Sequence, residues 1–237
     1  MLARLSVCAA ALMLVATPAV AIPLEATAPG ELSLYEIYNN IYSSEFAGYS
    51  SHQDFLDNAV LVDTADFFTN IMQSSGSITA QAHYAWFNQT FGLYQADSEG
   101  NITNSLEMFN SISEQGMLSG AEYTATFDVD GPVAGFYNSI VGPYTGIPWI
   151  TWYSDDSLNW WNSNPSSPHM LIYQGQNENE FVIAWEDTPL ALSDRDYNDL
   201  VLTITLGGEN IVPEPTTMLL LGMGLAGVAA RRLRRKD

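Results

Sequence analysis

The chain has 237 residues, of which 47% are hydrophobic and 12% aromatic, and its formal net charge is −20 at pH 7. This length suits one sizeable domain with additional segments, and the aromatic content argues against an intrinsically disordered chain. The negative charge argues against nucleic acid and anionic membrane surfaces as partners, because both would be repelled.

The first 21 residues have the pattern of a secretory signal peptide. One arginine is followed by an apolar run and by Ala-Val-Ala at 19–21, where cleavage is expected. An uncleaved membrane anchor is the alternative. Cys8 is the only cysteine, and Val7 stands before it where a lipoprotein signal would have a small residue. The mature chain is therefore expected to contain no thiol and no disulfide.

Residues 22–76 are predicted to form an N-terminal helical segment. Ser33 and Glu36 have the spacing of a capping box, and the apolar residues that follow recur at helical spacing. A second helical piece is predicted over Gln53–Met72, where the apolar pattern is less regular.

Residues 77–208 are predicted to form a β-domain. Short β-branched or aromatic segments alternate there with turns rich in Gly, Pro, Asn and Asp, and the segments include SITAQAHYAWF, AEYTATFDV, HMLIYQ, FVIAWE and LVLTITL. Such spacing is typical of an antiparallel β-sandwich. The predicted fold class is therefore mainly β, a jelly-roll-like sandwich preceded by the short helical segment.

The C-terminal segment 209–237 combines an apolar stretch with a basic end. Residues 216–230 are uncharged, and 15 residues make a helix of roughly 22 Å, whereas a comfortable bilayer span needs about 20 residues. The basic residues after this stretch would hold its end on the cytoplasmic side; they are Arg231, Arg232, Arg234, Arg235 and Lys236. A plain single-pass anchor and a sorting signal both fit this pattern.

The motif Val212-Pro213-Glu214-Pro215, the short apolar helix and the terminal basic cluster together resemble the PEP-CTERM sorting signal of Gram-negative bacteria. The resemblance implies export through the inner membrane, transient anchoring by the C-terminal helix, and processing by an exosortase, a membrane enzyme of transpeptidase type. It also implies a location in the cell envelope or outside the cell, commonly in bacteria that make exopolysaccharide.

Removal of both ends leaves one basic residue, Arg195. The other six Lys and Arg residues lie in the signal peptide and the tail, whereas 25 of the 27 acids lie in residues 22–212. The mature domain thus has a formal charge near −24. Such a surface keeps a secreted protein soluble and also suits a protein that binds divalent cations.

Enzyme signatures are absent from the sequence. His52, His83 and His169 match no metal-ligand spacing, and no zinc-protease, nucleophile-elbow or phosphate-binding motif occurs. A glycoside hydrolase that uses a pair of carboxylates stays open as an alternative, because so many acids always include a suitable pair.

Four of the six tryptophans fall within 13 residues, at 149, 152, 160 and 161. Such a cluster either fills the core of a sandwich or presents rings that stack on sugars. Adjacent residues of a strand face opposite sides, so Trp160 and Trp161 would not both enter one core. Trp152, Trp160 and Trp161 are the candidate glycan contacts.

The stretch SDRDYNDLVLTI, residues 193–204, follows the predicted strand FVIAWED across a short loop. Two adjacent strands would bring the acids at their ends together, and oxygen ligands at alternate positions suit a hard cation such as Ca²⁺. The candidate ligands are Glu186, Asp187, Asp194, Asp196, Asn198 and Asp199. The pattern is not an EF-hand loop, because Asp199 stands where that loop has glycine. A tight hairpin, with the aspartates accepting backbone N–H bonds, is the alternative.

The acidic pair at 186–187, followed by D-R-D-Y-N-D at 194–199, is similar to domain-of-unknown-function family 4114. His169 resembles a histidine on the preceding strand of that family, whereas Leu190-Ala191-Leu192 departs from its glycines. The resemblance implies an extracellular β-sandwich with a cation-holding loop and brings no established activity.

The sequence thus predicts a secreted, non-enzymatic β-domain that binds Ca²⁺ and associates with an extracellular polysaccharide matrix. Arg195 is expected to act as an internal counter-charge to the acids, tied to Asp194 or Glu186. A purely structural matrix or surface component and a carbohydrate-active enzyme are the alternatives.

Overall fold

The structure is a computed structural model of the whole chain, and it describes residues 27–43, 48–141, 148–159, 168–188 and 193–207. The predicted signal peptide and the segment 209–237 lie outside these ranges. Among the helices that the structure describes, none is long and apolar enough to cross a bilayer.

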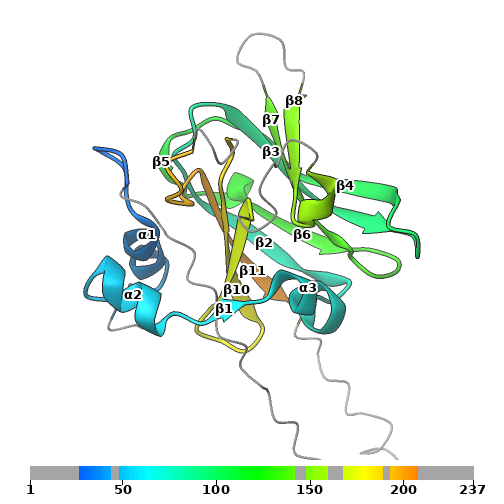
Figure 1. Cartoon of the computed structure of the whole chain (residues 1–237), viewed down its shortest axis with the longest axis horizontal. Helices are drawn as coiled ribbons and strands as arrows, with labels where there is room; N and C mark the ends of the chain where they lie inside the picture. The colour runs from blue at the N-terminus through cyan, green and yellow to red at the C-terminus, as the bar shows by residue number, and fades with distance from the viewer. Residues whose placement is uncertain (1–26, 44–47, 142–147, 160–167, 189–192, 208–237) are drawn as a thin grey trace, which may run out of the picture.

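Two antiparallel sheets form the domain (Figure 1). The seven-stranded sheet, called sheet A below, has the order β1-β9-β10-β11-β2-β5, with β6 also paired to β2. Its strands are β1 (Leu61–Val62), β2 (Ser75–His83), β5 (Gly116–Met117), β6 (Thr124–Asp128), β9 (Met170–Gln174), β10 (Glu180–Trp185) and β11 (Leu200–Leu206). The four-stranded sheet B has the order β4-β3-β7-β8, with strands β3 (Asn88–Ala96), β4 (Ile102–Ile112), β7 (Gly135–Val141) and β8 (Pro148–Tyr153). The prediction of a mainly β, antiparallel fold is confirmed.

The main core lies between the two sheets. Alternate residues of β10 and β11, among them Phe181, Ile183 and Leu202, pack with Phe91 and Phe136 of sheet B in one buried cluster. Because residues of both sheets share this cluster, the sheets pack face to face as in a sandwich. The jelly-roll-like connectivity stays a prediction.

The other face of sheet A is covered by two helices, α1 (Leu34–Ile41) and α2 (His52–Asn58), which lie beside it in Figure 1. The rings of Tyr38, Phe55 and Tyr173 meet there, with 4.9 Å between the ring centroids of Phe55 and Tyr173. A strand that is buried on both faces needs apolar residues at successive positions, which explains the runs FVIAW and LVL.

Helix α1 begins where the capping box predicts. The Glu36 carboxylate accepts a hydrogen bond from the backbone N–H of Ser33 at 2.9 Å. The predicted helical piece Gln53–Met72, in contrast, is interrupted. Helix α2 ends at Asn58, strand β1 follows, and the short helix α3 (Thr64–Asp66) leads into a π-helical turn, η1 (Phe67–Ile71).

The interruption has a local cause. Val60-Leu61-Val62 favours extended backbone, and Asp63 then caps a new helix, its side chain accepting from the backbone N–H of Asp66 at 2.9 Å. The turn that follows places Phe67 in the main core. Since β1 and the start of β2 both belong to sheet A, residues 61–76 are part of the sheet domain and not of a separate helical segment.

Two short 3-10 helices complete the described elements, η2 (Ala121–Tyr123) and η3 (Asp156–Leu158). The second of them directly follows β8 and lies at the edge of sheet B.

Truncation of a single ring tests whether the helical layer belongs to the folded domain. Phe55 is fully buried, whereas its neighbour Leu56 on the same helix is 38% exposed. We expect Phe55→Ala to lower the free energy of unfolding by about 3–5 kcal/mol and Leu56→Ala by about 0.5 kcal/mol, as measured by urea denaturation of the mature domain. Equal losses in the two variants would show that the helices are not packed on the sheet.

Candidate metal centre

The predicted acidic residues gather at one end of sheet A, where β10 ends and β11 begins. Trp185 pairs with Leu200 in the antiparallel register of these strands. Glu186 and Asp187 therefore leave β10 beside the point at which Asp199 enters β11. The hairpin geometry that the sequence predicted for these three acids is present.

Glu186, Asp187 and Asp199 form what we call the strand triad. One carboxylate oxygen from each residue lies within 4.8 Å of those of the other two. The backbone N–H of Asp187 donates to Oδ2 of Asp199 at 2.7 Å, and Nε2 of Gln89 donates to Oδ2 of Asp187 at 3.0 Å. Oε2 of Glu186 is buried and has no hydrogen-bond partner.

Glu31, Asp194 and Asp196 form a second group, the loop triad, whose carboxylate oxygens also lie within 4.8 Å of one another. Asp194 is exposed, Glu31 half-buried and Asp196 buried. Oδ2 of Asp196 is a second buried carboxylate oxygen without a partner. The loop triad thus has one open side, whereas Glu186 and Asp187 of the strand triad are only 1% and 2% exposed.

Glu31 was missed by sequence reasoning. It precedes helix α1 and is separated from Asp194 by more than half of the chain, so no local spacing connects the two. Asn198 joins these segments: its Nδ2 donates to the backbone oxygen of Leu32 at 3.0 Å and to Oε2 of Glu31 at 3.4 Å. The N-terminal helical segment therefore supplies an acid to the site in addition to covering the sheet.

The loop itself alternates in backbone conformation. Arg195 and Tyr197 both have φ of 56°, in the left-handed region that few non-glycine residues adopt. The Tyr197 ring is buried under the loop, and its hydroxyl donates to the backbone oxygen of Pro168 at 2.6 Å. This anchor holds the left-handed residues in place between Asp194, Asp196 and Asn198.

The loop at 193–199 also has some of the hydrogen bonds of the alternative interpretation, a tight turn in which side chains accept from backbone N–H groups. Oγ of Ser193 accepts from the backbone N–H of Arg195 at 2.8 Å, and Oδ1 of Asp196 accepts from that of Asn198 at 3.3 Å. These bonds use one oxygen of Asp196 and leave the other without a partner.

A buried polar layer supports the strand triad from sheet B. Nε1 of Trp152 donates to the backbone oxygen of Asp187 at 2.6 Å, and the Trp152 ring stacks on His169 at 3.6 Å. Nδ1 of His169 lies 3.0 Å from the backbone oxygen of Glu186. Since that oxygen can only accept, Nδ1 carries the proton. Asn138 donates to Gln89 at 3.2 Å and so extends the layer across the sheet.

The prediction that Trp152 contacts a glycan is wrong, because its side chain is fully buried. The alternation of β8 turns this ring toward the core, as the alternative interpretation of the tryptophan cluster held. Trp160 and Trp161 lie outside the described residues, and so do the sorting motif 212–215 and the basic cluster 231–236.

Burial raises the pKa of Glu186, Asp187, Asp196 and Asp199. The carboxyl of Glu186 has its pKa raised to about 7 and that of Asp196 to about 7, in each case first by burial and then by neighbouring carboxylates. The pKa of Asp187 rises to about 6, again mainly through burial, and that of Asp199 rises well above its usual value. The site therefore holds more carboxyl groups than it can keep ionised without added positive charge.

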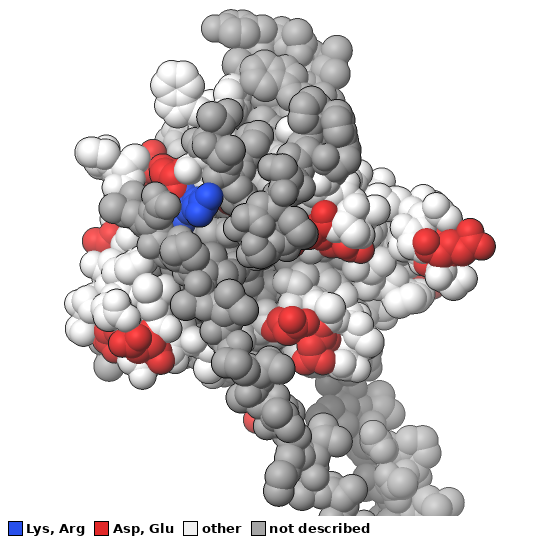
Figure 2. Space-filling model, in the orientation of Figure 1, with Lys and Arg blue, Asp and Glu red and all other residues white. Residues whose placement is uncertain are grey.

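Arg195 is the only Lys or Arg among the described residues, and Figure 2 shows the resulting single basic area beside acidic side chains. It lies between two members of the loop triad in sequence and is half-buried. Burial of His169 lowers its pKa to about 4, so this ring is neutral and adds no charge at neutral pH. One guanidinium cannot balance the six acids of the two triads, and its predicted tie to Asp194 or Glu186 stays a prediction.

The raised pKa values determine how the stability of the metal-free domain depends on pH. Between the pKa of the unfolded acids, 4.5 for Glu and 3.8 for Asp, and the folded values near 7, the folded state keeps protons that the unfolded chain has released. Folding then takes up protons, so stability falls as pH rises. We expect the melting temperature in EDTA to fall between pH 5 and pH 8, with a loss of stability on the order of a few kcal/mol.

Two variants separate this effect from general charge repulsion. Glu186→Gln with Asp196→Asn should flatten the pH dependence in EDTA, whereas Asp128→Asn with Asp130→Asn, two exposed acids on and next to β6, should leave the slope unchanged. A melting temperature that rises steadily from pH 5 to pH 8 would contradict the assignment.

Comparisons with known proteins agree with both resemblances found in the sequence. The model of the PEP-CTERM protein-sorting motif matches residues 212–235, and that of a domain of unknown function, DUF4114, matches residues 137–207. No curated protein and no solved structure gave a significant match. The DUF4114 match runs from within β7 to the end of β11 and so includes five of the six acids at the site, with Glu31 outside it. The chain thus combines a β-domain similar to DUF4114 with a C-terminal PEP-CTERM protein-sorting motif.

Proposed function

We propose that this protein is an exported, non-enzymatic component of the cell envelope or extracellular matrix whose β-domain binds Ca²⁺ at its two acidic triads. The sorting motif supports export and recognition by an exosortase-type processing enzyme. The motif bears only on where the protein goes, so the proposed activity rests on the site.

The observation that carries the proposal is the pair of buried carboxylate oxygens without partners, Oε2 of Glu186 and Oδ2 of Asp196. A buried carboxylate oxygen that lacks a donor is costly. A structure tolerates it when a proton or a cation occupies the site. Each of these two residues belongs to a triad whose carboxylate oxygens lie within 4.8 Å of one another, so each carboxylate already has neighbours that would share a cation.

The donor chemistry favours Ca²⁺ over other common ions. All candidate ligands are oxygens, and Ca²⁺ takes 6–8 oxygen ligands at 2.3–2.6 Å in flexible geometry. Two oxygens on opposite sides of such an ion are about 5 Å apart, and the oxygens of each triad lie within 4.8 Å of one another, close enough to contact a single ion. Zinc would be expected to recruit nitrogen or sulfur, yet neither triad contains a histidine or a cysteine.

The charges of the two triads influence each other's pKa values. Asp194 of the loop triad raises the pKa of Glu186 and of Asp187 in the strand triad, and Glu186 in turn raises that of Asp196. A cation in either triad would lower the charge that the other must hold. We therefore expect the entry of a first ion at the more open loop triad to ease ionisation of the strand triad.

The geometry does not favour a glycoside hydrolase at this site. Glu186 and Asp187 are 1% and 2% exposed, whereas a glycosidic bond must lie between the two carboxyl groups that cleave it. Reducing-sugar release from extracellular polysaccharide would support the enzyme. We expect none from the purified mature domain.

Titration with Ca²⁺ tests the proposal directly. We expect calorimetry of the mature domain to detect binding, and the melting temperature to rise with Ca²⁺ at neutral pH. An ion present at 100 times its dissociation constant would stabilise the fold by about 2.7 kcal/mol, which corresponds to roughly 5–10 °C for a domain of this size. Glu186→Gln with Asp199→Asn should remove the strand triad, and Asp194→Asn with Asp196→Asn the loop triad.

The matched control is Asp128→Asn with Asp130→Asn, which removes the same amount of charge away from the site. This control should bind Ca²⁺ as the unaltered domain does. If the melting temperature does not respond to millimolar Ca²⁺, or responds equally in all three double variants, the Ca²⁺ proposal fails and the purely structural alternative stands.

Arg195 gives a second test, because a counter-charge matters most when no cation is present. We expect Arg195→Gln to lower the melting temperature more in EDTA than in Ca²⁺, and Arg195→Lys, which keeps the charge, to lower it less. Both variants have an unbranched β-carbon at the same left-handed position, so backbone strain is matched. An equal loss of melting temperature with and without Ca²⁺ in Arg195→Gln would show that the guanidinium and the ion are not coupled.

A further inference from the structure

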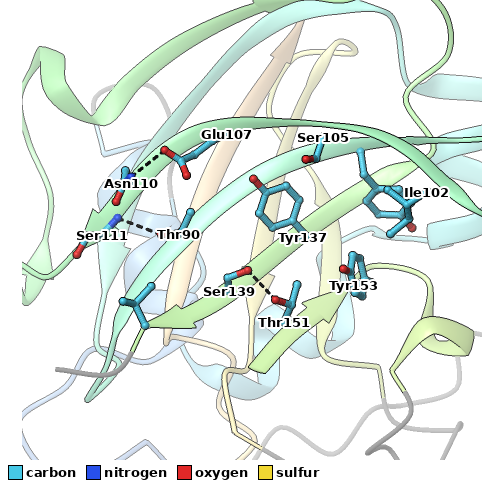
Figure 3. A pocket seen from close by; sticks show the side chains of 12 residues that line it. Thr90, Ile102, Ser105, Glu107, Asn110, Ser111, Tyr137, Ser139, Thr151 and Tyr153 are labelled. Carbon is cyan, nitrogen blue, oxygen red and sulfur yellow. Dashed lines mark hydrogen bonds between the residues drawn. The ribbon is translucent and has the colours of Figure 1, made fainter. Parts of the chain in front are cut away.

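The outer face of sheet B, which points away from the core, is hollowed (Figure 3). The hollow has a volume of about 420 Å³ and lies across all four strands of the sheet. This is within the range of sites that hold small ligands or single units of a polymer. None of its lining residues belongs to the acidic triads.

The floor of the hollow consists of tyrosine rings that lie over glycines. Tyr137 of β7 pairs with Gly92 of β3, and a methyl group at Gly92 would overlap the Tyr137 ring. Tyr94 and Gly135 form the same arrangement with the strands exchanged. Because each glycine leaves room above its strand, each ring folds down across the neighbouring strand.

These rings continue to the edge of the sheet. Tyr153 of β8 pairs with Tyr137, and its ring meets that of Tyr94 edge to face at 5.5 Å. Tyr94 is buried, whereas Tyr137 and Tyr153 are half-buried and keep part of their surface open to the hollow. A row of tyrosines with open ring surface is suited to packing against the apolar faces of sugar rings.

Around the rings stand short hydroxyl, amide and carboxylate groups. Ser139 and Thr151 share a hydrogen bond of 2.8 Å between their hydroxyls, and Nδ2 of Asn110 donates to Oε1 of Glu107 at 2.9 Å. Figure 3 shows both pairs bordering the hollow on either side of Tyr137. Glu107 and Asn110 are exposed, so both can also reach a ligand. Such groups exchange hydrogen bonds with hydroxyls that are donors and acceptors at once.

The charge of the lining restricts the ligand. Its lining residues that the structure describes include no Lys, Arg or His, and the one carboxylate among them belongs to Glu107. Burial raises the pKa of Tyr137 above its ordinary value, so this phenol stays neutral at physiological pH. Phosphate, sulfate or uronate groups would find no positive partner here and would be repelled by Glu107. A neutral ligand rich in hydroxyl groups meets no such cost.

From these contacts we propose that the hollow on sheet B binds a segment of neutral polysaccharide, with sugar rings packed on Tyr137 and Tyr153 and their hydroxyls bonded to Glu107 and Asn110. The inference rests on the proposed place of the protein in the cell envelope or extracellular matrix, and it is independent of the Ca²⁺ site. It replaces Trp152, which is buried, as the glycan contact.

Affinity electrophoresis and calorimetry of the full mature domain test this inference. Dextran, a soluble mixed-linkage β-glucan and cellohexaose serve as neutral probes, and alginate serves as the anionic probe. We expect at least one neutral probe to retard or bind the domain and alginate not to. Tyr137→Ala with Tyr153→Ala should weaken binding at least tenfold. Glu107→Ala with Asn110→Ala, two exposed residues whose loss leaves the core intact, should weaken it several-fold.

Trp86→Ala is the matched aromatic control, because Trp86 is 92% exposed and lies outside the hollow. It should bind as the unaltered domain does. The inference is overturned if no neutral probe binds, if alginate binds equally well, or if Glu107→Ala with Asn110→Ala binds as the unaltered domain does. Loss of binding in Trp86→Ala alone would also overturn it and assign the contact to that ring.

The change in melting temperature with Ca²⁺, measured on the same variants, distinguishes the proposal of Ca²⁺ binding from the proposal of glycan binding. Hollow variants that lose glycan binding should retain the rise in melting temperature with Ca²⁺. Glu186→Gln with Asp199→Asn should keep glycan binding and show a smaller rise in melting temperature with Ca²⁺. Glycan binding that fails in the unaltered domain while the Ca²⁺ shift persists would refute only this inference.

Discussion

The close approach of buried carboxyl groups where β10 meets β11 is the constraint on which this end of the domain depends. Glu186, Asp187 and Asp199 are brought together by strand pairing, and strand pairing is fixed by the apolar residues of both faces of sheet A. The register that buries Trp185 and Leu200 therefore also forces acids into contact. Favourable packing elsewhere opposes this repulsion, and a bound cation would remove it.

The same acids connect the two sheets. Asp187 accepts from Gln89 of β3 through its side chain and from Trp152 of β8 through its backbone, while its own N–H donates to Asp199. A group that is hydrogen-bonded from both sheets couples the charge at the site to the packing of the sandwich. A change in the protonation of these carboxyl groups should consequently alter the packing of the core as well as the conformation of the loop.

The sequence predicted those parts of the site whose positions depend on the spacing of residues within one segment of the chain. The hairpin that joins 186–187 to 199 could be predicted, because two apolar runs end in acids and antiparallel strands bring such ends together. Glu31 could not, since its position depends on how α1 packs across sheet A. Trp152 could have been assigned to the core only from the alternation of β8. The hollow on sheet B arises from Tyr–Gly pairs across strands, whose register no single segment of the sequence reveals.

The bond from Asn198 to the backbone of Leu32 has a consequence for the order of events during export. Glu31 lies ten residues after the predicted cleavage point at residue 21, and Asp199 directly precedes β11, the last strand that the structure describes. An ion in the loop triad would be held only by a chain in which Glu31 has met Asp194 and Asp196. Translocation delivers the N-terminal ligand first and the C-terminal ones last. Metal loading at the loop triad would thus have to follow the packing of the N-terminal segment against the loop at 194–196.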